Sequence, residues 1–176
     1  MANNKYEDFY DIIEEIGCSS FSSVYKAKVK DKEEFVAINI TDKEKIKSTL
    51  RNEYSKQDIE EEYNEFIIVM ELCDGNLIDF IKLKKDLNIN DIYELLCQLN
   101  NTFKIMKERR IAHRNLKLHD ILVKYENKEK TKYTFKICDY CVSKEFLSLS
   151  NRFTTKVGMV NYMAPEVLSE EKYNYK

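Results

Sequence analysis

The spacing of hydrophobic and polar residues predicts a strand-rich first part of the chain. Residues 12–17, 24–29 and 35–40 form short apolar or alternating runs, which are typical of β-strands. Thr41 or Asp42 is then expected to cap a polar, Lys-rich helix that extends to about Glu53. The apolar run at residues 66–70 predicts one further strand.

The spacing becomes helical in the second part of the chain. Leu77, Ile78 and Ile81 share one face of a predicted helix, and a longer apolar stripe begins at Asn90 and continues for about five turns. We expect this long helix to be buried on more than one side, because additional apolar residues widen the stripe. These additional residues are Tyr93, Cys97 and Ile105.

A strand pair is expected after the long helix, at residues 121–123 and 133–137, joined by a polar hairpin loop at 126–132. Strands therefore dominate the first part of the chain, and helices dominate the second. This order predicts an α+β fold in two lobes, with the boundary near residues 71–76.

Composition restricts the function classes. The 176 residues fit one ordinary domain or two small lobes, and a hydrophobic content of 43% excludes a disordered tail. Lys and Arg number 29 against 31 Asp and Glu, so the chain lacks the basic excess of a nucleic-acid-binding protein. No apolar run approaches the roughly 20 residues that a membrane-spanning helix needs.

The location of the protein is predicted from its first residues and its cysteines. The polar N-terminal residues do not resemble a signal peptide, and five cysteines are an odd number. We therefore expect reduced thiols and a cytoplasmic protein without membrane insertion or nucleic-acid binding.

Five short motifs follow one another in a fixed order. They are Gly-Cys-Ser-Ser-Phe-Ser-Ser-Val at 17–24, Val-Ala-Ile-Asn at 36–39, His-Arg-Asn-Leu-Lys-Leu-His-Asp at 113–120, Asp-Tyr-Cys at 139–141 and Ala-Pro-Glu at 164–166. Together they resemble the Gly-rich loop, Val-Ala-Ile-Lys strand, catalytic loop, Asp-Phe-Gly triplet and Ala-Pro-Glu motif of the eukaryotic protein kinases. Lys117, two residues after Asn115, resembles the Ser/Thr-kinase version of the catalytic loop.

The resemblance implies a two-lobe kinase-like fold, with a β-rich N-lobe at residues 1–72 and a partial C-lobe at 73–176 that ends just after Ala-Pro-Glu. It also implies ATP and Mg²⁺ as cofactors and a protein as substrate or partner. Asp120 and Asp139 are the expected Mg²⁺ ligands. The residues expected at the nucleotide are Gly17, Val24, Ala37, Met70, Glu71, Cys73 and Leu122, with the backbone of Glu71 and Cys73 holding the adenine.

Several departures from the family pattern fall on catalytic positions. Asn39 stands where the family has the lysine that binds the α- and β-phosphates, so Glu53, the expected partner of that lysine, has lost its cation. Asn115 replaces the catalytic aspartate, and a carboxamide cannot act as a base at neutral pH. We therefore expect a pseudokinase with weak, Mg²⁺-dependent ATP binding and a regulatory or scaffolding role.

Smaller departures fall on the loops. Ser19 and Ser22 replace the second and third glycines of the phosphate loop, Cys141 replaces the glycine of the triplet, and Met159 replaces a usual threonine. Two other functions remain open, a residual Ser/Thr kinase and a decayed kinase product without a defined role.

The resemblance also implies changes in the fold. The span from Asn39 to Met70 is short for a helix and a strand, so the family's αC helix and the following strand are expected to be shortened. The later C-lobe helices are expected to be absent, which would expose apolar residues of the long helix for association.

Simpler alternatives exist for the remaining polar residues. Cys138 and Cys141 have the spacing of a zinc or redox pair, and His113 and His119 with Asp120 have metal-ligand chemistry. The resemblance instead predicts that His113 packs under Tyr140. It also makes Thr154 or Thr155 a candidate phosphorylation site for pairing with Arg114.

Overall fold

A computed structural model describes residues 5–19, 22–42, 65–140, 143–145 and 158–169 of the chain. The chain divides into two compact units, Met1–Leu72 and Cys73–Lys176. Together they give the α+β fold that the sequence predicts.

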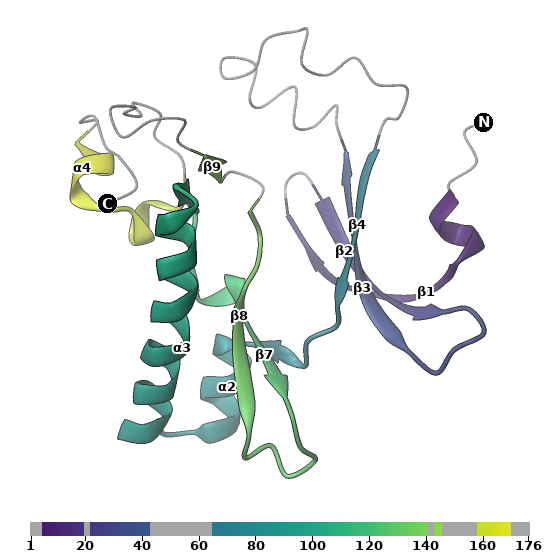
Figure 1. Cartoon of the computed structure of the whole chain (residues 1–176), viewed down its shortest axis with the longest axis horizontal. Helices are drawn as coiled ribbons and strands as arrows, with labels where there is room; N and C mark the ends of the chain where they lie inside the picture. Colours follow the sequence, from purple (N-terminus) through teal and green to yellow (C-terminus); the bar gives the residue numbers. More distant parts are fainter. Residues whose placement is uncertain (1–4, 20–21, 43–64, 141–142, 146–157, 170–176) are drawn as a thin grey trace, which may run out of the picture. The chain divides into compact units, whose positions relative to one another are not determined.

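The first unit is a four-stranded antiparallel sheet with the strand order β1-β2-β3-β4 (Figure 1). A short 3-10 helix, η1, precedes it at Lys5–Asp8. The strands are β1 (Tyr10–Cys18), β2 (Ser22–Val29), β3 (Phe35–Asp42) and β4 (Glu65–Glu71). All four strands expected from the sequence are confirmed.

Strand β3 extends two residues further than the sequence predicts, through Thr41 and Asp42. Thr41 lies opposite Phe66 and Asp42 lies opposite Glu65 of β4. Pairing with β4 and the β-branched side chain of Thr41 favour this extension. The helix that Thr41 or Asp42 is expected to cap, including Glu53, and the expected shortening of the following strand lie outside the described residues.

One face of this sheet carries the core of the first unit. Ala27, Val36 and Ile38 are buried there, and Tyr6 and Tyr10 pack against them. Since side chains alternate along a strand, Ala37, Asn39 and Thr41 of β3 lie on the other face.

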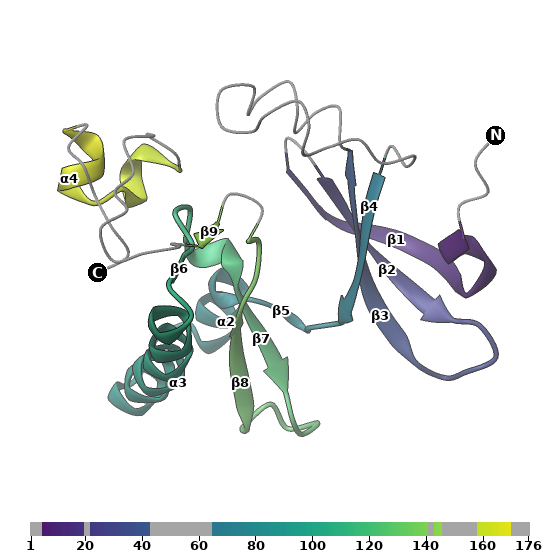
Figure 2. The same cartoon turned by 45° about the horizontal axis from the view of Figure 1, so that its top comes forward.

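The described part of the second unit combines two larger helices with a three-stranded sheet of order β5-β7-β8, and it also contains a short helix, α4, and a two-stranded sheet of β6 and β9. Its larger elements are α2 (Leu77–Lys84), α3 (Ile89–Glu108), β7 (Ile121–Tyr125) and β8 (Tyr133–Ile137), and Figure 2 shows both helices beside the β7–β8 hairpin. The smaller elements are β5 (Gly75–Asn76), β6 (Ile111–Ala112), η3 (Leu118–Asp120), β9 (Lys144–Glu145), η4 (Val160–Tyr162) and α4 (Pro165–Leu168). The predicted long helix and strand pair are confirmed, whereas the two-residue strands were not predicted.

Aromatic and aliphatic side chains from the helices and the hairpin form the core of the second unit. Its buried members are Leu77, Phe80, Leu99, Ile121, Val123 and Phe135. Asn76 and Asn88 cap the two helices, each with an aspartate three residues later that completes a capping box. These caps fix where α2 and α3 begin, and the core fixes the hairpin against them.

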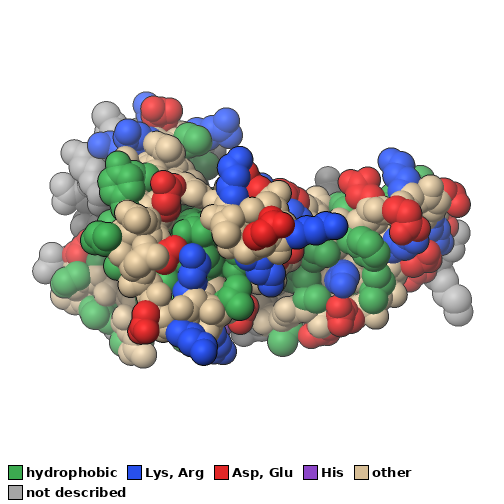
Figure 3. All heavy atoms as spheres, turned by 90° about the horizontal axis from the view of Figure 1, so that it is seen from below, with side chains coloured by type: hydrophobic (Ala, Val, Ile, Leu, Met, Phe, Trp, Pro, Cys, Tyr) green, Lys and Arg blue, Asp and Glu red, His purple; other side chains and the backbone are tan. Residues whose placement is uncertain are grey.

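Helix α3 is buried on one side only, contrary to the sequence expectation. Tyr93 is 65% exposed and Ile105 is 53% exposed, whereas Leu99 and Met106 are buried. Of the residues that widen the stripe, Tyr93 and Ile105 therefore lie at the surface, whereas Cys97 is half-buried. On the face drawn in Figure 3, apolar side chains are interspersed with charged ones. Of the helices that the structure describes, none is long and apolar enough to cross a lipid bilayer.

Candidate functional site

The candidate residues of the first unit begin in the connection between β1 and β2. Ser19 and Ser22 bracket this connection and bond to each other through both backbone and side chain. The Ser19 N–H donates to the Ser22 carbonyl at 2.7 Å, and the Ser22 N–H donates to the Ser19 hydroxyl at 3.1 Å. The two hydroxyl oxygens lie 3.0 Å apart. Gly17 precedes them in β1, and a Cβ atom added there would meet no atom within 4 Å.

The next candidates share one face of the sheet. Asn39 lies directly opposite Val24 of β2, and Ala37 lies directly opposite Met70 of β4. Directly opposed residues point to the same face, so the strand register places these four side chains together. The Asn39 side-chain oxygen Oδ1 accepts a hydrogen bond of 3.1 Å from the Thr41 hydroxyl, so the side-chain amide is engaged within its own strand.

The expected adenine-binding backbone groups lie where the first unit ends and the second begins. Glu71 is the last residue of β4 and lies opposite Val36, while Cys73 opens the second unit and is half-buried. Leu122 lies in β7, opposite Asn76 of β5, and is also half-buried.

His113 anchors the loop that carries the catalytic-position residues in the second unit. Its side chain is buried, and its Nε2–H donates to the Cys138 carbonyl at 2.8 Å. The centroid of its ring lies 4.9 Å from that of Tyr140. The predicted packing of His113 against Tyr140 is confirmed.

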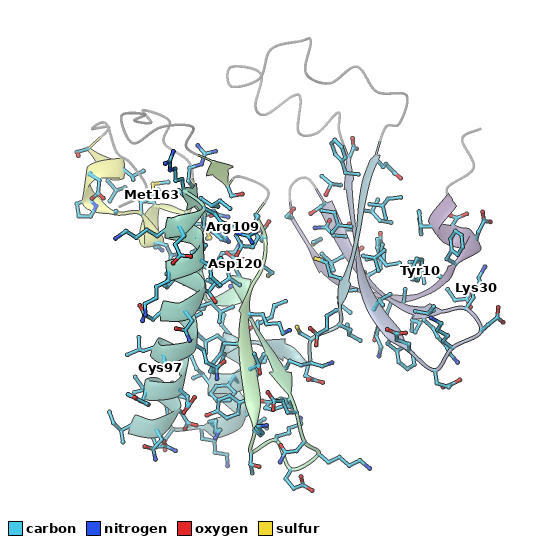
Figure 4. All side chains as sticks on the ribbon, viewed as in Figure 1. Tyr10, Lys30, Cys97, Arg109, Asp120 and Met163 are labelled. Carbon is cyan, nitrogen blue, oxygen red and sulfur yellow. The ribbon has the colours of Figure 1, made fainter. Side chains whose placement is uncertain are left out.

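Asp120 is the most buried charged residue of this loop, with an exposed fraction of 3% (labelled in Figure 4). Its carboxylate accepts a hydrogen bond of 3.1 Å from the Lys117 backbone N–H, and the Lys117 ammonium lies 3.7 Å away. Burial raises the pKa of Asp120, the charge of Lys117 opposes this, and the charge of Asp139 adds to it. The structure thus brings Lys117, Asp120 and Asp139 into one electrostatic cluster.

Asp139 follows β8 in a left-handed backbone conformation with φ of 62°. Next to it, the Cys138 N–H donates to the Asp120 carbonyl at 2.9 Å, which holds the end of β8 beside η3. Burial, with the charges of Asp120 and Asp139, raises the pKa of Cys138 to about 12, so its thiol stays protonated and unreactive at neutral pH.

Carboxylate oxygens are the ligands that Mg²⁺ prefers, so the donor chemistry of Asp120 and Asp139 suits that ion. Within the described ranges, no group of three or more His, Cys, Asp and Glu residues could hold a metal ion. His119 is exposed, and Cys141 lies outside the described residues, as do Thr154 and Thr155.

Asn115 lines a cavity of about 220 Å³ in the second unit. The other lining residues are mostly apolar and come from the same loop and from residues 159–167; Figure 4 labels Met163 among them. Gly158 brings the second segment against the first, because an added Cβ would lie 2.5 Å from the Arg114 carbonyl oxygen. Its φ of 116° also favours glycine.

Comparison with known proteins gives one family. A model of the protein kinase domain matches residues 10–176. Ribosomal protein S6 kinase alpha-2 of Homo sapiens is 27% identical over 98% of this chain, and hormonally up-regulated neu tumor-associated kinase of Homo sapiens is 30% identical over 87%. Serine/threonine-protein kinase ppk11 of Schizosaccharomyces pombe is 27% identical over 100% of the chain. The matched part covers 25%, 21% and 58% of these three relatives, respectively.

Proposed function

Because the chain belongs to the protein kinase family, we propose that it is a Ser/Thr-type kinase domain whose phosphotransfer is impaired or lost, and that it acts as a regulatory or scaffolding pseudokinase. Residues 1–72 would correspond to the N-lobe and residues 73–176 to part of the C-lobe. Asn115 is the observation on which this proposal rests.

Asn115 stands where the family has the aspartate that accepts the proton of the substrate hydroxyl. The amide oxygen of asparagine cannot take up that proton at neutral pH. General base catalysis contributes about 10²–10⁴-fold to a rate. Family turnover of roughly 1–100 per second would thereby fall to about one per second or far lower.

Asn39 lowers the expected turnover further. The family's lysine at this position supplies a positive charge to the phosphates, and Asn39 is neutral and hydrogen-bonded to Thr41. Phosphoryl transfer depends mostly on positioning and charge stabilisation. Combined with Asn115, this loss supports a turnover below roughly one per minute.

Residual binding of Mg·ATP is part of the proposal. Backbone groups at Glu71 and Cys73 would hold the adenine, since side-chain substitutions do not remove them. Asp120 and Asp139 would hold Mg²⁺, which supplies positive charge to the phosphates when it is bound. Lys117 would remain as a cation beside Asp120.

A protein is the expected partner. The exposed apolar side chains of α3 support association with another protein, because apolar surface that is left in water is unfavourable. Among the large hydrophobic side chains of this helix, Ile89, Tyr93 and Leu96 have the largest exposed fractions.

The test compares the full chain with its restored variants in a phosphotransfer assay with Mg·ATP and a peptide library containing Ser and Thr. The variants are Asn39→Lys, Asn115→Asp and the double variant, with Asn100→Asp on the exposed surface of α3 as the matched control. We expect the wild type and control to turn over less than about once per minute, and the double variant to gain 100-fold or more. Wild-type turnover of about 1–100 per second would refute the proposal and favour an active kinase.

A further inference from the structure

The two serines at the positions of the second and third glycines bond to each other. The Ser19 hydroxyl accepts a hydrogen bond of 3.1 Å from the Ser22 N–H. The same hydroxyl lies 3.4 Å from the Ser22 carbonyl oxygen and 3.0 Å from the Ser22 hydroxyl. Glycine has no side chain, so a loop with glycine at position 19 cannot form these bonds. The double substitution therefore creates a link that closes the connection between β1 and β2 on itself.

This link uses a group that a phosphate would need. Loops of this kind hold phosphate oxygens with backbone N–H groups that point at the ligand. Here the Ser22 N–H is already donated to Ser19, and the Ser19 N–H is donated to the Ser22 carbonyl at 2.7 Å. Binding a phosphate through either N–H would require one of these bonds to break.

One further feature of the first unit disfavours phosphate. Asn39 brings no positive charge, and its side chain is hydrogen-bonded to Thr41. The phosphates of a nucleotide therefore lack the cation that the family's lysine supplies at this position.

We propose that the Ser19–Ser22 link removes the contribution of the phosphates to binding, so that this chain binds adenosine about as tightly as ATP. This inference rests on the proposed function, since it assumes that the adenine site of the family is retained. Binding of a triphosphate through the Ser19 or Ser22 N–H would break a bond of this link. Ser19 is a positioning residue, because it acts by holding the Ser22 N–H away from a ligand.

The test measures the affinities of the full chain for adenosine and for Mg·ATP by calorimetry, in wild type and in Ser19→Ala. The wild type is expected to show adenosine and ATP affinities that are equal within about threefold. Ser19→Ala frees the Ser22 N–H and should raise ATP affinity about tenfold, the value of one hydrogen bond to a charged acceptor, without changing adenosine affinity. Ser23→Ala is the matched control and should leave both affinities unchanged, whereas Ser19→Thr keeps the hydroxyl and should behave as wild type.

Amide hydrogen exchange provides a second readout that needs no nucleotide. The Ser22 amide should exchange slowly in wild type and Ser23→Ala, and faster in Ser19→Ala. A wild type that prefers ATP by tenfold, equal Ser22 exchange rates in all variants, or no nucleotide binding in any variant would each overturn the inference. None of these outcomes decides the proposed loss of phosphotransfer, which the turnover assay measures separately.

Discussion

Asp91 joins α3 to α2 and to the β7–β8 hairpin, so its replacement tests how the second unit is held together. The residue is 4% exposed, and its carboxylate accepts hydrogen bonds from the Tyr133 hydroxyl at 2.7 Å and the Asn88 N–H at 3.2 Å. The Lys84 ammonium lies 2.9 Å from the same carboxylate. Asp91→Ala removes all three contacts at once.

The magnitude follows from these three contacts. A hydrogen bond to a charged group contributes about 1.5–3 kcal/mol, and a helix cap contributes typically about 1 kcal/mol. The Lys84 side chain is 29% exposed, so water would replace much of its ion pair with Asp91. The contribution of this ion pair to the free energy of unfolding is therefore small. We therefore expect Asp91→Ala to lower the free energy of unfolding by about 3 kcal/mol, and Tyr133→Phe to lower it by about 1.5 kcal/mol.

Urea unfolding followed by far-ultraviolet circular dichroism measures these losses, because the signal reports on α2 and α3. Asn90→Ala is the matched control, since it removes an exposed side chain from the same helical turn and should change stability by no more than about 0.5 kcal/mol. The double variant Asp91→Ala/Tyr133→Phe completes a thermodynamic cycle. The expected coupling energy between the two residues is about 1 kcal/mol or more.

The thermodynamic cycle can refute the inferred interaction between Asp91 and Tyr133. Additive losses, with a coupling energy below about 0.3 kcal/mol, would show that Asp91 and Tyr133 do not act on each other. A loss for Asp91→Ala as small as that for Asn90→Ala would show that the contacts contribute nothing to stability.

Three other predictions follow from the packing. Burial raises the pKa of Asp91, but the hydrogen bonds from Tyr133 and Lys84 outweigh it, so the pKa is lower in the folded chain than in the unfolded chain. The stabilisation by ionised Asp91 is therefore present above about pH 4 and is lost as pH falls through the folded pKa. The free energy of unfolding, measured during acid titration of the wild type and of Asp91→Ala, checks this prediction. Gly158→Ala should destabilise the second unit by on the order of 1–3 kcal/mol in thermal melts, because the residue has a φ of 116° and its added Cβ would lie against the Arg114 carbonyl oxygen. Gly17→Ala is the control and should cost far less, because a Cβ added at Gly17 meets no atom within 4 Å. Phe80→Ala, at a side chain 2% exposed, should cost about 3–5 kcal/mol in the same melts, and a loss below 1 kcal/mol would contradict the core assignment.

The main elements of the fold could be predicted because they depend on local spacing. The alternation in β2, the β-branched apolar run of β3 and the long apolar stripe of α3 are visible within single segments. The end of β3 was missed because Thr41 and Asp42 have good capping side chains, and only the distant partner strand β4 decides their conformation. The two-residue strands β5, β6 and β9 are too short to leave a pattern.

The sequence predicted which residues belong to the candidate site, but it did not predict most of the contacts that these residues make. Motif order located Asp120, and the family pattern anticipated the packing of His113 on Tyr140. The bonds between Ser19 and Ser22 could not be read from the sequence, although the serines themselves were visible as substitutions. The Asp91–Tyr133 bond joins residues far apart along the chain, and no local signal marks it.

The most direct test of the central claim is the turnover number of the purified wild-type chain with Mg·ATP and a Ser/Thr peptide substrate. The proposed loss of the base at Asn115 and of the phosphate-binding cation at Asn39 predicts less than about one turnover per minute. A turnover of about 1–100 per second by the purified chain would contradict this proposal, because phosphotransfer would then require neither an aspartate at position 115 nor a lysine at position 39.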